Sequence, residues 1–139
     1  MKKLAEYFIW PIIFVLILDC CFTLIGQPGD YWQNFNAISE SSPIGFFLLK
    51  INPILFIDAF IVYMVVIYVI LRKIPQSAAI IVGLSLFLGH VWGSASWLPV
   101  IYHQYKFPRF EFYQWWLTIS YFVIIAIASV ILIRIRRDD

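Results

Sequence analysis

Residues 54–71, ILFIDAFIVYMVVIYVIL, decide the fold class, because the run is apolar or aromatic at every position except Asp58. A second run, residues 117–133 (LTISYFVIIAIASVILI), is interrupted only by hydroxyl side chains. A hydrocarbon core about 30 Å thick is crossed by roughly 20 helical residues, so each run is long enough to span a bilayer. Over the whole chain 63% of residues are hydrophobic and 13% charged, against about 25% charged in soluble domains. The sequence therefore predicts an integral membrane protein.

Proline, capping and basic residues set the helix boundaries around these runs. Ser42-Pro43 and Asn52-Pro53 each combine an N-cap residue with proline at the first helical position. They predict a short interfacial helix over residues 43–51 and a spanning helix over 53–73, although a single long kinked helix is the alternative. The other spanning helices are expected at about 7–26, 75–98 and 112–134, the third ending before Pro99. We expect one domain, residues 1–139, forming an all-α integral membrane bundle of four transmembrane helices.

The first apolar stretch follows Lys2 and Lys3, as it does in a secretory signal. However, Asp19 interrupts the stretch and no small-x-small cleavage site follows it. We therefore expect residues 7–26 to remain as the first spanning helix.

Basic residues divide unevenly between the two sides of the predicted bundle. Seven lie on the side of the termini (Lys2, Lys3, Arg72, Lys73, Arg134, Arg136 and Arg137) and three on the other (Lys50, Lys106 and Arg109). Cytoplasmic segments carry the excess of Lys and Arg, so both the N and the C terminus are predicted to be cytoplasmic. This form is typical of a multi-pass protein of a prokaryotic inner membrane. No basic stripe follows one face of the chain, which argues against a nucleic-acid partner.

Three ionisable residues, Asp19, Asp58 and His90, fall at a similar depth in this topology, roughly 8–12 Å below the outer interface. A charge at the centre of a spanning helix costs about 2.5–3.5 kcal/mol on insertion scales, so these groups are expected to face the interior and find partners. Their ligand types suit several divalent metals. An interhelical hydrogen bond that serves packing alone is the competing interpretation.

Helical spacing brings further polar residues to the same layer. Thr23 follows Asp19 by four residues, Ser94 follows His90 by four, and Thr118 and Tyr121 are three apart on the fourth helix. The candidate ligand- or ion-binding residues are therefore Asp19, Thr23, Glu40, Asp58, His90, Ser94, Thr118 and Tyr121, with Glu40 reaching the site from the outer loop.

The small residues Ser85, Gly89 and Gly93 recur every four positions on the third helix. Such a row allows close backbone approach, which predicts packing within the bundle or, as the alternative, self-association. The many Phe and Trp residues also fit a bound pigment with His90 as an axial ligand, but lipid-facing aromatic belts account for them more simply. The sequence does not identify a cofactor.

Asp19-x3-Thr23 on the first helix, followed by Glu40-x2-Pro43, resembles a family of small uncharacterised prokaryotic integral membrane proteins. Its members share Asp-x3-Thr, a Glu-Asn-Pro-like element and a lysine; here Ser42 replaces the asparagine and Lys50 matches the lysine. The resemblance ends near Lys50. It implies that Asp19, Thr23 and Glu40 act together, and it implies no activity.

Enzyme motifs such as His-Glu-x2-His, Gly-x-Ser-x-Gly and a phosphate-binding glycine loop do not occur in the sequence. We therefore predict a small non-enzymatic membrane protein: an accessory subunit, or a module that binds an ion or small ligand at an outward-facing polar site. Its expected partners are the lipid bilayer and either further copies of itself or other membrane subunits. One alternative is a proton- or cation-coupled transporter or channel subunit acting as an oligomer. Another is a metal-dependent membrane enzyme that activates water at Asp19, Asp58 and His90.

Overall fold

The computed structural model describes residues 4–105 and 111–138, and these residues form helices and connecting segments without a β-strand. The elements, in chain order, are α1 (Leu4–Ile25), the 3-10 helix η1 (Gly29–Trp32), α2 (Pro43–Ile51), α3 (Pro53–Lys73), α4 (Gln76–Gln104) and α5 (Glu111–Asp138). Four of them, α1, α3, α4 and α5, are long and apolar enough to cross a membrane. The prediction of an all-helical protein with four such helices is confirmed.

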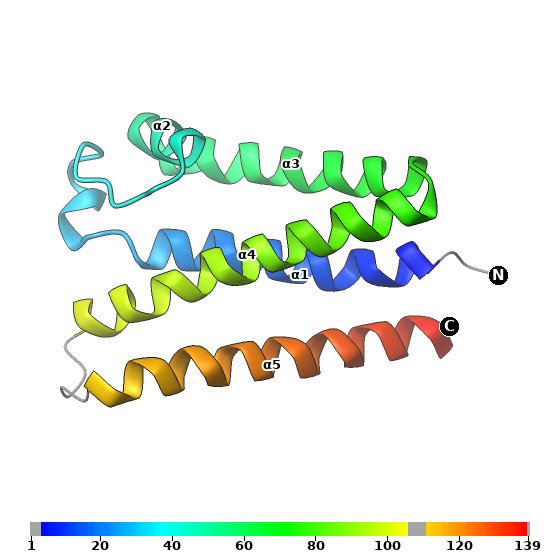
Figure 1. Ribbon diagram of the computed structural model, residues 1–139. Coiled ribbons are helices and arrows are strands. Elements are labelled where there is room, and N and C mark those ends of the chain that lie inside the picture. Colours follow the sequence, from blue (N-terminus) through cyan, green and yellow to red (C-terminus); the bar gives the residue numbers. More distant parts are fainter. Residues whose placement is uncertain (1–3, 106–110, 139) are drawn as a thin grey trace.

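Helices α1 and α4 form the centre of the bundle, with α3 along one side and α5 along the other (Figure 1). Both ends of the described chain lie at one end of the bundle, whereas η1 and α2 lie at the opposite end (Figure 1). We call the end that carries η1 and α2 the distal end. The most extensive contact joins α1 to α4, so residues on these two helices have the best opportunity to meet.

Three groups of buried apolar residues hold the helices together. One joins α1, α3 and α4 through residues such as Ile12 and Leu71, and a second joins α1, α4 and α5 through Val15 and Ile125. A third, at the distal end, is centred on Tyr31. The outer faces of the spanning helices are also apolar, because lipid takes the place of water there.

The two predicted N-caps are present. The Ser42 hydroxyl accepts a hydrogen bond from the Gly45 N–H at 3.2 Å, and Asn52 Oδ1 accepts one from the Ile54 N–H at 2.7 Å. Asn52 has an extended backbone (φ −170°, ψ 134°) that separates α2 from α3. Residues 43–73 therefore form two helices, and the alternative of one kinked helix is wrong.

The predicted end of the third spanning helix, near residue 98, is wrong. Helix α4 continues through Pro99 to Gln104. Proline removes one backbone hydrogen bond from a helix but does not end it where neighbouring helices support the chain, which is common in membrane proteins. Pro11 inside α1 is accommodated in the same way and is buried.

Two buried polar side chains fix the segment between α1 and α2. Gln27 donates through Nε2 to the carbonyls of Thr23 (2.9 Å) and Ser39 (3.1 Å), and its Oε1 accepts from the Ser39 N–H at 3.0 Å. The Tyr31 hydroxyl donates to the Leu49 carbonyl of α2 at 2.9 Å. These bonds attach the segment before α2 to the distal end of α1, and they attach η1 to α2.

Candidate functional site

The site is built around a pair of side chains that joins α1 to α4. Nδ1 of His90 lies 2.6 Å from Oδ2 of Asp19, and the two side chains are 21% and 15% exposed. An ionised carboxylate only accepts hydrogen bonds, so Nδ1 carries the proton of this bond. The other ring nitrogen, Nε2, is then left to face a different partner.

Gly93, one turn after His90, allows the Asp19 carboxylate to lie against α4. A Cβ atom placed on Gly93 would lie 3.0 Å from Oδ1 and 3.2 Å from Oδ2 of Asp19. The close approach of α1 to α4 at this level therefore depends on the missing side chain of Gly93.

Helix α3 supplies the third group at the site. The Tyr63 hydroxyl lies 3.4 Å from His90 Nε2, beyond the usual range of a strong hydrogen bond. The rings of Phe60 and Tyr63 lie at 6.2 Å and 5.9 Å from the imidazole, measured between ring centres. The imidazole is therefore held by Asp19 on one side and bordered by aromatic rings on the other.

A pocket of about 390 Å³ lies beside His90, between α2, α3 and α4. Its walls are mainly apolar, and they comprise Ser42, Ile44, Gly45, Leu48, Phe56, Ala59, Phe60, Tyr63 and His90. The volume falls within the range of small-molecule sites. Such sites combine an apolar lining with a few polar groups that fix orientation, which here are His90, Tyr63 and Ser42.

Glu40 lies at the edge of this pocket. Its Oε1 accepts a hydrogen bond from the Ser42 N–H at 2.7 Å, and its side chain borders Gly45. A carboxylate just before the N-terminus of a helix is favoured by the helix dipole. Glu40 therefore stabilises the start of α2, whose first turn forms one wall of the pocket.

Ser94 and Tyr121 form a separate buried contact between α4 and α5. The Ser94 hydroxyl lies 2.6 Å from the His90 carbonyl and 2.7 Å from the Tyr121 hydroxyl. Because Ser94 has one hydrogen to donate to the carbonyl, Tyr121 acts as the donor to Ser94. This contact supports the helical turn that carries His90 and does not involve its ring.

The prediction that Asp58 faces the interior is wrong. Asp58 is exposed and forms no hydrogen bond or ion pair within the described part of the chain. It lies two residues from both Phe56 and Phe60, which face inward, and a separation of two residues places it on the opposite side of the helix. The predicted metal set of Asp19, Asp58 and His90 is therefore not assembled, and no other group of three potential ligands is found among the side chains that the structure describes, those of residues 8–105 and 116–135.

The remaining predicted residues have simpler positions. Thr23 is buried one turn after Asp19, and Thr118 of α5 is half-buried. Ser85 and Gly89 are exposed, and no atom lies within 4 Å of a Cβ placed on Gly89. The prediction that the small-residue row packs inside the bundle therefore holds only at Gly93.

Sequence reasoning missed Tyr63 and Gln27. Tyr63 lies in the middle of a spanning run, away from the interface positions where tyrosine is usual. This unusual position is the feature of the sequence that could have indicated a role for Tyr63. Gln27 follows the last apolar residue of α1 and resembles an ordinary loop residue in sequence, although its side chain is fully buried.

Comparison of the chain with protein-family models, with curated proteins and with solved structures finds no match. The resemblance of the first part of the chain, up to about Lys50, to a family of small membrane proteins therefore stays a prediction.

Proposed function

We propose that this chain is a small non-enzymatic membrane protein that binds a small amphipathic molecule in the pocket beside His90. The observation that supports this function is the position of His90, whose Nδ1 is held by Asp19 while its ring borders a mainly apolar pocket. The apolar part of a ligand would contact the walls, and a hydroxyl or amine group would donate to Nε2. A hydrated cation fits this lining less well, because hard cations prefer several oxygen ligands.

The proposal includes an orientation in the membrane. Arg72, Lys73 and Arg134 are exposed near the end of the bundle that holds the termini, and Lys50 is exposed at the distal end. Applied to the whole chain, the excess of basic residues at the termini favours a cytoplasmic location for both ends. The pocket then lies in the outer half of a prokaryotic inner membrane.

Lateral assembly is part of the same proposal. Most of the described residues belong to the four helices that are long and apolar enough to span a membrane. Further copies of the chain or other membrane subunits would therefore contact it within the bilayer. The protein would act as an accessory subunit of such an assembly.

Native mass spectrometry of the gently solubilised protein from its own host tests this function. We expect a small molecule to remain bound to the wild-type chain and to be lost from His90→Ala. Ser85→Ala, on the exposed side of the same helix, is the matched control and should retain the molecule. A wild-type chain without any bound small molecule, or equal retention by His90→Ala, would contradict the proposal. An added polypeptide would identify the partner of an accessory subunit.

A second candidate is a subunit of a proton-coupled transporter or channel. The observation that favours it is the row of three titratable side chains, Asp19, His90 and Tyr63, from three spanning helices. Four helices enclose little space, so this function requires an oligomer. Asp19→Asn should then abolish proton flux in proteoliposomes, and unchanged flux would exclude the candidate.

A further inference from the structure

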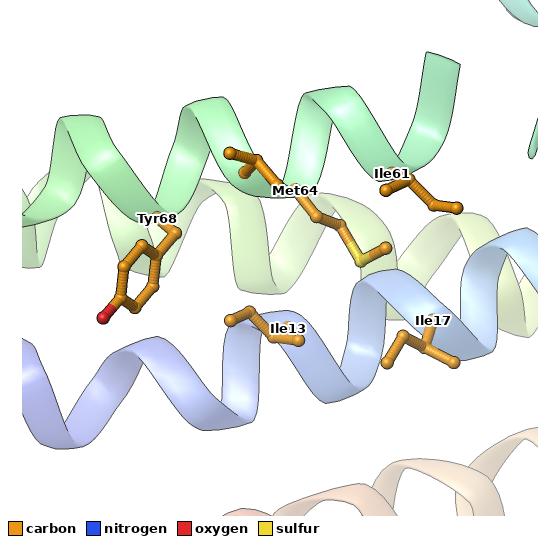
Figure 2. A pocket seen from close by; sticks show the side chains of 6 residues that line it. Ile13, Ile17, Ile61, Met64 and Tyr68 are labelled. Atoms are coloured by element: carbon orange, nitrogen blue, oxygen red, sulfur yellow. The ribbon is translucent and has the colours of Figure 1, made fainter. Parts of the chain in front are cut away.

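A second pocket lies between α1 and α3, apart from His90. It has a volume of about 240 Å³ and is lined by Ile13, Ile17, Ile61, Met64, Val65 and Tyr68. Figure 2 shows that Ile13 and Ile17 point from α1 toward α3, while Ile61, Met64 and Tyr68 point back toward α1. All six residues belong to segments that can span a membrane, so the groove is placed within the hydrocarbon layer. An acyl chain is the apolar molecule present at that depth.

Two basic residues, Arg72 and Lys73, lie near one end of the groove. Tyr68 closes this end (Figure 2), and Arg72 Nη1 donates to the Tyr68 hydroxyl at 2.9 Å. The Arg72 guanidinium also lies 5.5 Å from the centre of the Tyr68 ring. Lys73 is the next residue, and both cations are exposed in the last turn of α3. The apolar groove therefore leads to two positive charges at the membrane boundary.

We propose that this groove binds an anionic phospholipid, with one acyl chain between α1 and α3 and the phosphate at Arg72 and Lys73. A guanidinium binds phosphate through paired, charge-assisted hydrogen bonds. Basic pockets between spanning helices at a membrane surface bind the head groups of anionic lipids.

The charges favour a lipid over a second copy of the chain. A symmetric dimer in a membrane has its two-fold axis along the membrane normal, so equivalent residues of the two copies lie at the same depth. Two copies that met at this groove would bring both pairs of Arg72 and Lys73 together at one membrane surface. A phosphate would place negative charge beside these two cations, whereas a second copy would place two further cations there.

Native mass spectrometry of the full chain, released from liposomes of phosphatidylcholine and phosphatidylglycerol, tests the proposal. We expect retained phosphatidylglycerol in excess over its share of the liposome. Arg72→Gln should lower that retention roughly tenfold, as expected for the loss of a charge-assisted contact. Lys50→Gln removes an exposed cation from the distal end and should retain the lipid as the wild type does.

Val65→Phe supplies an independent variant, because it fills the groove and leaves both cations in place. Retention of phosphatidylglycerol should fall in this variant as well. Equal retention of the two lipids by the wild type would overturn the proposal. Unchanged retention by Val65→Phe, or an equal loss in Lys50→Gln and Arg72→Gln, would also overturn it, because charge alone would then account for the binding.

Discussion

The carboxylate of Asp19 lies 2.6 Å from Nδ1 of His90 and also lies against the backbone of Gly93, one turn further along α4. The contact links the two helices that pack most extensively in the bundle. A carboxylate and an imidazole, both mostly buried, thus fix the relative position of α1 and α4 near the pocket.

The Asp19–His90 contact should contribute measurably to stability. Interhelical hydrogen bonds in membrane bundles average about 0.6 kcal/mol, whereas a buried ion pair that loses one partner costs roughly 3–5 kcal/mol. We expect Asp19→Ala to lower the free energy of unfolding by about 1–3 kcal/mol, between these limits. Asp58→Ala is the control. Asp58 is exposed, so this variant should keep the free energy of unfolding of the wild type. Denaturant unfolding in detergent measures both, and equal losses in the two variants would contradict the assignment.

Two glycines of α4 provide a matched pair of substitutions. Gly93→Ala places a methyl group 3.0 Å from the Asp19 carboxylate, so the carboxylate or α1 must move. Gly89→Ala meets open space and gains helix propensity, about 0.8–1 kcal/mol. We expect Gly93→Ala to lower the thermal unfolding temperature and Gly89→Ala to leave it unchanged or raise it. A lower unfolding temperature for Gly89→Ala than for Gly93→Ala would show that α1 does not approach α4 closely at Gly93.

Gln27 should control the order of the segment between α1 and α2. Gln27→Ala removes both hydrogen bonds to the Ser39 backbone, and each such bond contributes about 0.5–1.5 kcal/mol. We expect faster amide hydrogen exchange across residues 28–41 in this variant. Gln33→Ala is the control, because Gln33 is exposed and its side chain forms no hydrogen bond within the described residues. Equal exchange in the two variants would contradict a role for Gln27.

Alkaline pH should destabilise the segment between α1 and α2, because it ionises Tyr31. Burial raises the pKa of the Tyr31 hydroxyl above its ordinary value of 10.0, because the charged phenolate is poorly solvated in the fold. The folded state therefore holds this proton more tightly than the unfolded state does. The stability that Tyr31 contributes is fully present below pH 10.0 and declines as the pH rises above it.

Tyr31→Phe tests this pH dependence. The variant loses the hydrogen bond to the Leu49 carbonyl, which contributes about 1 kcal/mol, and it should also lose this alkaline decline in stability. Unfolding curves measured between neutral and strongly alkaline pH give the comparison. An alkaline decline of equal size in both proteins would assign it to another group.

Local chemistry in the sequence determined the helices. Long apolar runs cross the bilayer because only a helix satisfies its backbone hydrogen bonds within one segment. Ser42-Pro43 and Asn52-Pro53 predicted the starts of α2 and α3 because capping depends on neighbouring residues alone. The shared level of Asp19 and His90 in the bundle was also predictable, since it follows from counting residues along each helix.

Only the tertiary structure decided which face of each helix turns inward. In a soluble protein the polar face of a helix marks the outside, but the helices of this bundle are apolar on the sides that face protein and lipid alike. Asp19 and Asp58 therefore look equivalent in sequence, and packing alone directs Asp19 toward His90 while leaving Asp58 on the outer face of α3. The two pockets, the contact of Tyr63 with His90 and the burial of Gln27 depend in the same way on helix rotation and on contacts between distant segments. The spacing of apolar residues predicts the rotation of a helix only where one face of the helix contacts water and the other contacts protein.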